Sequence, residues 1–209
     1  MPTRASTRQR QSSVVILPLA LVALLVLGLV AAGFVARERA TSTTLAHGAA
    51  AAPPWPAPAD KAARASAAQL PNVYGLKLAE HIHTHLTITI DGVAETVPGQ
   101  IGLDEKHHFA TALHTHNTSG IIHIESPVKR DFTLGQFFTN WDVRLDSRHV
   151  GAEGGDIGET LTVFVDGHRR VGDPASIRLR DLDDIDLVIA PAGTIVRPAT
   201  PFDWPSNYH

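Results

Sequence analysis

Apolar and polar residues alternate along two stretches of the chain with the two-residue period of a β-strand. In the first stretch, His81–Ile90, three histidines and two threonines fall on one face, while Leu86 and the isoleucines fall on the other. Asp91-Gly92 follows at once and is a typical two-residue hairpin turn. This stretch therefore predicts an amphipathic strand with a histidine face, which returns through a tight turn.

The second stretch, Leu113–Ser126, reads LHTHNTSGIIHIES and predicts a hairpin closed by Asn117–Gly120. A four-residue loop gives three cross-strand pairs, which are His114 with His123, Thr115 with Ile122, and His116 with Ile121. Directly opposed residues have Cβ atoms about 5 Å apart, and residues two apart on a strand share a face. We therefore expect His114, His116 and His123 to converge on one side, with Glu125 further along.

One helix and a second hairpin complete the predicted elements. Thr133-x-x-Gln136 is a capping box, and it opens a run of apolar residues with helical spacing that includes Phe137, Phe138 and Trp141. Leu161–Val165 leads into another Asp-Gly turn, and Ile185–Ala190 reads as a late strand. We predict a mainly β domain with one packed amphipathic helix, of the α+β class, built as a small sandwich or a β-grasp-like fold. Phe202 and Trp204 in the Pro-rich tail are expected to pack back on this domain.

The first third of the chain differs in composition from the rest. Residues 14–36 form a 23-residue run without a charge, long enough to cross a bilayer as a helix. The run is longer than the apolar region of about 7–15 residues in a signal peptide, which favours an uncleaved signal anchor over a cleaved signal peptide. Three arginines precede the run and predict that the N-terminus lies in the cytoplasm. The predicted organisation is a basic cytoplasmic tail at 1–13, a transmembrane anchor at 14–36, an Ala/Pro-rich linker at 37–70, and a His-rich domain outside the cytoplasm at 71–209.

Charge and composition narrow the possible ligands. The chain has no cysteine, so disulfides and thiolate metal sites are excluded. From residue 71 onward there are 11 Lys and Arg against 19 Asp and Glu, a net charge of −8 that repels nucleic acid and attracts cations. The expected partners are a membrane, bound through the N-terminal helix, and a metal ion. The sequence does not indicate a protein partner.

The histidine spacing predicts a metal site. Imidazoles at alternating positions of one strand, joined by an imidazole of a neighbouring strand, form a common ligand set for Zn or Cu. We expect the two stretches to lie side by side and to bind one divalent metal ion. The predicted ligands are His83, His85, His114, His116 and His123.

The motifs resemble an uncharacterised group of secreted or membrane-anchored proteins from bacteria and archaea. The resemblance rests on HxHxxLxIxIDG, LHTHxxSGIIHIESP, FTLGQFF followed by a tryptophan, and a late VDG turn, and it covers roughly residues 80–190. It implies no established activity. It implies that the same five histidines recur in the group.

Three functions remain open at this stage. The first is a tethered metal-binding domain that serves sensing, delivery or protection. The second is a metalloenzyme, hydrolase or oxidoreductase, in which three histidines and an open position activate water, with Glu125, Glu80 or an unused histidine as base. The third is an envelope interaction domain whose histidine face responds to pH. Whether the protein is an enzyme is not decided by the sequence.

Overall fold

The structure, a computed structural model, describes residues 48–155 and 158–208. The predicted cytoplasmic tail at 1–13 and the predicted anchor at 14–36 lie outside these residues. Within the described part of the chain, no helix is long and apolar enough to cross a membrane.

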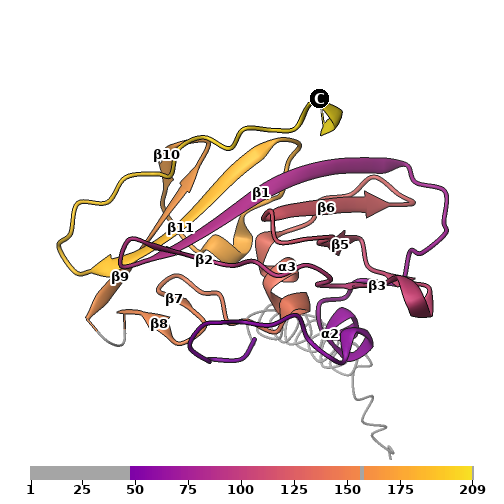
Figure 1. The fold of residues 1–209 in the computed structure, drawn as a ribbon, viewed down its shortest axis with the longest axis horizontal. Helices are drawn as coiled ribbons and strands as arrows, with labels where there is room; N and C mark the ends of the chain where they lie inside the picture. The colour runs from indigo at the N-terminus through magenta and orange to yellow at the C-terminus, as the bar shows by residue number, and fades with distance from the viewer. Residues whose placement is uncertain (1–47, 156–157, 209) are drawn as a thin grey trace, which may run out of the picture. The chain divides into compact units, whose positions relative to one another are not determined.

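The described strands build one main mixed sheet of seven strands, in the order β10-β9-β11-β1-β6-β5, with β2 also paired to β1 (Figure 1). Its strands are β1 (Glu80–Ile90), β2 (Val93–Glu95), β5 (Leu113–His114), β6 (Ile121–Ser126), β9 (Glu159–Val165), β10 (His168–Arg170) and β11 (Asp183–Pro191). β1 runs parallel to β11, and the other pairs are antiparallel. The predicted α+β class is therefore observed, whereas a sandwich is not, because the main strands form a single sheet.

Short elements surround this sheet. Two small hairpins are β3 (Leu103–Asp104) with β4 (Phe109–Ala110), and β7 (His149–Val150) with β8 (Glu153–Gly154). The helices among the described residues are α2 (Lys61–Ala67) and α3 (Leu134–Trp141), with 3-10 turns η1 (Glu105–His107), η3 (Pro174–Ser176) and η4 (Ser206–Tyr208).

Both Asp-Gly turns adopt the backbone that their sequence predicts. Asp91 and Gly92 have φ values of 51° and 82°, and Asp166 and Gly167 have φ values of 51° and 73°. Positive φ at both central positions matches the twist of a two-residue hairpin, and Asp-Gly is a favoured pair there. The first turn joins β1 to β2, and the second joins β9 to β10.

The 113–126 hairpin is shorter than predicted. The pair His114–His123 is confirmed, but β5 ends at His114. The predicted pair of Thr115 with Ile122 is wrong, because the Thr115 amide donates to the Ile101 carbonyl at 3.1 Å. The pair of His116 with Ile121 is likewise not formed, since the ladder stops at His114. The chain therefore leaves the sheet at residue 115, and His116 stands just outside it.

Helix α3 covers one face of the sheet and forms the core with it (Figure 1). The predicted capping box is present, with the Thr133 hydroxyl accepting from the Gln136 amide and the Gln136 side chain accepting from the Thr133 amide. The helix buries an aromatic stripe against the apolar face of the strands. The residues of this shared core include Leu86, Ile88, Ile122, Ile124, Phe137, Phe138, Trp141, Ile185 and Leu187.

Residues 48–70, predicted to belong to a linker, instead pack on the domain, which corrects the predicted boundary at residue 71. Trp55 is only 5% exposed, and its ring meets that of Trp141 edge-on at 6.0 Å. The Trp141 indole donates to the Trp55 carbonyl at 3.2 Å. Helix α2 follows, and Ala68 and Leu70 are buried beyond it. The sequence did not predict this contact, because a single large apolar side chain in an Ala/Pro-rich segment produces no periodic pattern.

The C-terminal tail crosses the other face of the sheet, as predicted for Phe202 and Trp204. The Phe202 amide donates to Asp184 at 2.9 Å, and the Ala199 amide donates to Asp186 at 3.2 Å. Both acceptors belong to β11, so the tail lies along the face that α3 leaves uncovered.

Replacing Trp55 with alanine is expected to lower the free energy of unfolding by about 3–5 kcal/mol, because it leaves a cavity against Trp141. Urea unfolding of the full-length protein measures this change. Val171, 97% exposed, supplies the matched control, and Val171→Ala should alter stability by less than about 0.5 kcal/mol. Equal stabilities for both variants would contradict the packing of residues 48–70.

Candidate metal centre

A row of three histidines crosses three neighbouring strands of the sheet. His83 on β1 is directly opposite His123 on β6, and His123 is directly opposite His114 on β5. Directly opposed residues point to the same side of a sheet, with Cβ atoms about 5 Å apart. The opposite side of these strands is the apolar face under α3, so the register that buries the core also aligns the histidines.

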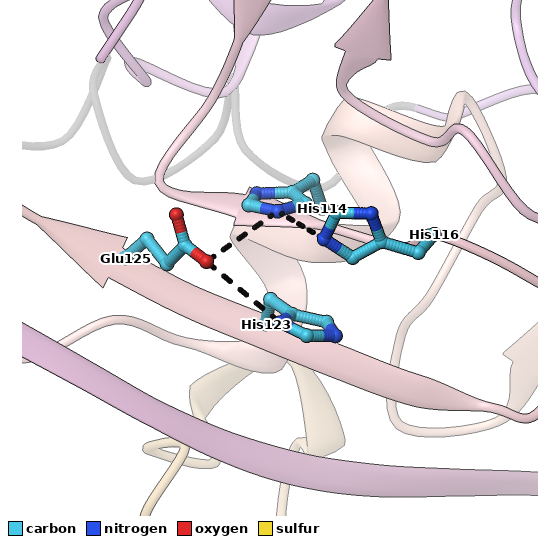
Figure 2. Close-up of side chains that lie close together, drawn as sticks. All are labelled: His114, His116, His123 and Glu125. Atoms are coloured by element: carbon cyan, nitrogen blue, oxygen red, sulfur yellow. Dashed lines mark hydrogen bonds and ion pairs between the residues drawn. The ribbon is translucent and has the colours of Figure 1, made fainter. Parts of the chain in front are cut away.

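Four side chains gather at the β5 end of this row, and we call them the Glu125 group: His114, His116, His123 and Glu125 (Figure 2). Each offers one ligand atom, and these four atoms lie within 4.8 Å of one another. The Nε2 atoms of His114 and His116 are 3.2 Å apart. Two nitrogens bound to one tetrahedral ion at about 2.0–2.1 Å are separated by roughly 3.4 Å. This pair of imidazoles is therefore already at ligand spacing.

His114 is held with one nitrogen directed at the group. Its Nδ1 atom lies 2.9 Å from the Thr111 carbonyl, which can only accept, so Nδ1 carries the proton and Nε2 presents a lone pair. The residue is 2% exposed, and burial lowers its pKa to about 4. The ring is therefore neutral at neutral pH, in the tautomer that ligates through Nε2.

Glu125 supplies the negative charge of the group. Its Oε1 atom is 3.8 Å from His123 Nδ1, 3.9 Å from His114 Nε2 and 3.2 Å from His81 Nε2. The contact with His123 and the charges of His114 and His81 lower the pKa of Glu125 to about 2, against the opposing effect of burial. The carboxylate is thus ionised at neutral pH and is directed at three imidazoles.

A second group lies beside the first, on the β1 side of His123, and consists of His81, His83 and His123; we call it the β1 group. His83 is 9% exposed, and its buried Nε2 atom has no hydrogen-bond partner among the described residues. Burial, with the nearby His123 and His81 charges, lowers the pKa of His83 to about 4. The Nδ1 atom of His123 is also buried and without a hydrogen-bond partner in the described chain.

His85 lies outside both groups, although it stands on the same face of β1. Its Nδ1 is 2.7 Å from Asp184 on β11, and its Nε2 is 3.2 Å from the Ser119 carbonyl. The Phe202 ring stacks on it at 3.7 Å with an interplanar angle of 11°. Both ring nitrogens therefore face other acceptors, and the structure separates His85 from the four other predicted ligands.

The five predicted ligands leave out His81 and Glu125. The alternation places Glu125 on the face of His123, two residues further along, whereas its pairing with His81 across the β1–β6 ladder is seen only in the structure. His168 belongs to neither group: it is exposed on β10 at the other end of the sheet, with its Nδ1 2.7 Å from the Asp166 carbonyl.

Comparison with known proteins yields no match to a protein-family model, a curated protein or a solved structure.

Acid is expected to destabilise the metal-free protein between pH 6.5 and pH 4. In this range the unfolded chain takes up protons at His83 and His114, whereas the folded chain does not, because both folded pKa values are near 4. The free energy of unfolding therefore falls as the pH falls, by at most about 2 kcal/mol per proton between pH 6.5 and pH 5.

Urea unfolding at pH 7 and pH 5 in the presence of a chelator measures this effect. His114→Gln should lose less stability between the two pH values than the parent protein, whereas the variant of exposed His168, His168→Gln, should follow the parent. Identical pH dependence in His114→Gln and the parent would contradict the assignment of a neutral, buried His114.

Proposed function

We propose that this protein binds a divalent transition-metal ion at the Glu125 group. The observation that carries the proposal is the 3.2 Å separation of the His114 and His116 Nε2 atoms. Two imidazole nitrogens at this distance either bind the same ion or form a hydrogen bond in which one nitrogen donates its proton to the other. Three imidazoles and one ionised carboxylate supply four donors, the number that a tetrahedral site requires.

Zn(II) and Cu(II) are the ions that this donor set favours. Imidazole suits both metals, and the absence of cysteine removes the thiolate ligands that Cu(I) prefers. Copper binds more tightly than zinc to a given set of nitrogen and oxygen ligands. We therefore expect Cu(II) to displace Zn(II) where both are available.

The donor count favours a binding role over catalysis. A catalytic zinc site usually keeps three protein ligands and one open position, whereas four protein donors fill a tetrahedral ion. His116 is exposed while His114 and His123 are buried, so the ion has a route from solvent to the buried ligands. Sensing, delivery or protection against metal at a cell surface fits such a site.

The location of the domain belongs to the same proposal. The uncharged run at 14–36 would anchor the protein in the cell membrane as a single-pass helix, with the metal-binding domain outside the cytoplasm. The excess of acidic residues from residue 71 onward would draw cations toward that domain.

Alanine variants test the metal site. In full-length protein, His114→Ala and His123→Ala should each weaken Zn(II) or Cu(II) binding by about 10-fold or more. Replacing even a residue that only hydrogen-bonds to a ligand commonly lowers metal affinity 10–100-fold. His168→Ala, on the far strand of the sheet, is the matched control and should bind like the parent. Competition titration with a chromophoric chelator measures the affinities.

Circular dichroism should show folded protein for all three variants without metal, because the core under α3 forms without the ion. If His114→Ala and His123→Ala bind metal as tightly as His168→Ala, the Glu125 group is not the binding site.

Membrane attachment is tested by fractionation of cells that express the full-length protein. We expect the protein in the membrane fraction, released by detergent and not by high salt, with its N-terminus intact. A released protein with a new N-terminus near residue 40 would contradict the anchor.

A further inference from the structure

We propose that the histidine face holds a second metal ion at the β1 group, and that the two ions share His123 as a ligand. The inference rests on the proposed binding of a first ion at the Glu125 group. It assigns a role to His81 and His83, which the first ion does not use.

The observation that supports a second metal ion is the buried Nε2 atom of His83. His83 is 9% exposed, yet its Nε2 atom finds no hydrogen-bond partner in the part of the chain that the structure describes. A buried polar atom without a partner costs free energy, and an ion or a water bound to it is one way in which native proteins offset that cost. The Glu125 group does not include His83, so the first ion leaves this nitrogen unsatisfied.

The three nitrogens of the β1 group are close enough to share one ion. Their ligand atoms lie within 4.8 Å of one another, so shifts of about an ångström bring them to the roughly 3.4 Å spacing of a tetrahedral site. The His81 and His83 rings are 4.9 Å apart, and the His83 and His123 rings are 4.7 Å apart. Tyr208 packs edge-on against His83 at 4.5 Å and helps to hold its ring in place.

His123 occupies the middle strand and belongs to both groups. Its Nδ1 atom is 3.8 Å from Glu125 Oε1, so the nitrogen left for the second ion in this proposal is the other one, which Figure 2 shows at the far end of the ring from that carboxylate. An imidazole that ligates through both nitrogens loses its remaining N–H proton to solvent and bridges the ions as imidazolate. The negative imidazolate and the Glu125 carboxylate together offset part of the charge of two adjacent dications.

Metal stoichiometry of the full-length protein tests the inference. The protein is purified in detergent, stripped with a chelator, loaded with excess Cu(II), desalted and analysed for metal by mass spectrometry. We expect two ions per chain for the parent, and one for His83→Ala and for His81→Ala. The His81 side chain is 52% exposed, so His81→Ala removes a ligand without disturbing the core.

The control His168→Ala should keep two ions. One ion per parent chain would overturn the second position and leave the first intact, whereas no bound ion would overturn both. Two ions in His81→Ala and His83→Ala as well as in the parent would place the second ion elsewhere and overturn the assignment.

Electron paramagnetic resonance tests the bridge separately. Two Cu(II) ions joined through one imidazolate couple magnetically, so the fully loaded parent should show less signal than its copper content predicts. His83→Ala, with one ion, should show the full signal of an isolated Cu(II). A full, uncoupled signal from the two-copper parent would overturn the bridging role of His123.

Discussion

The register between β1, β6 and β5 is the constraint on which the candidate metal centre depends. Leu86, Ile122 and their neighbours must face α3, because a slip of one residue would turn the whole apolar set of a strand toward solvent. With that register set, His83, His123 and His114 can only stand in a row on the opposite side. The hydrophobic core therefore positions the candidate ligands on the opposite face of the sheet. A site of this kind is preorganised by the fold itself, without dependence on the ion for folding.

The histidine face combines neutral imidazoles with one charged carboxylate. Burial keeps the His83 and His114 rings neutral, and a neutral imidazole is the form that ligates a metal. Glu125, in contrast, remains charged beside them, as its pKa of about 2 requires. The Glu125 carboxylate is 3.8–3.9 Å from two of these imidazoles and 3.2 Å from His81 Nε2. In the proposed site, a cation would bind between this carboxylate and the neutral imidazoles.

Local pattern was sufficient to predict which side chains share a face and that the two histidine stretches lie side by side, and insufficient to predict the strand on the other side of β1. The alternation in β1, the two Asp-Gly turns, the capping box of α3 and the pair His114–His123 all follow from rules that act within a few residues. The placement of β11 parallel to β1 does not follow from them. That placement determines the contacts of His85, because it brings Asp184 to hydrogen-bond distance from His85, which lies 99 positions earlier in the chain. Trp55 was misjudged for a similar reason, since its partner Trp141 is 86 positions away.

Anomalous X-ray diffraction from crystals grown with Zn(II) would locate a bound ion in the Glu125 group without a mutation. We expect an anomalous peak at about 2.0–2.1 Å from the Nε2 atoms of both His114 and His116, on the side that Glu125 faces. A structure in which zinc binds only at exposed histidines such as His168, with the Glu125 group unchanged and without a peak, would contradict the account.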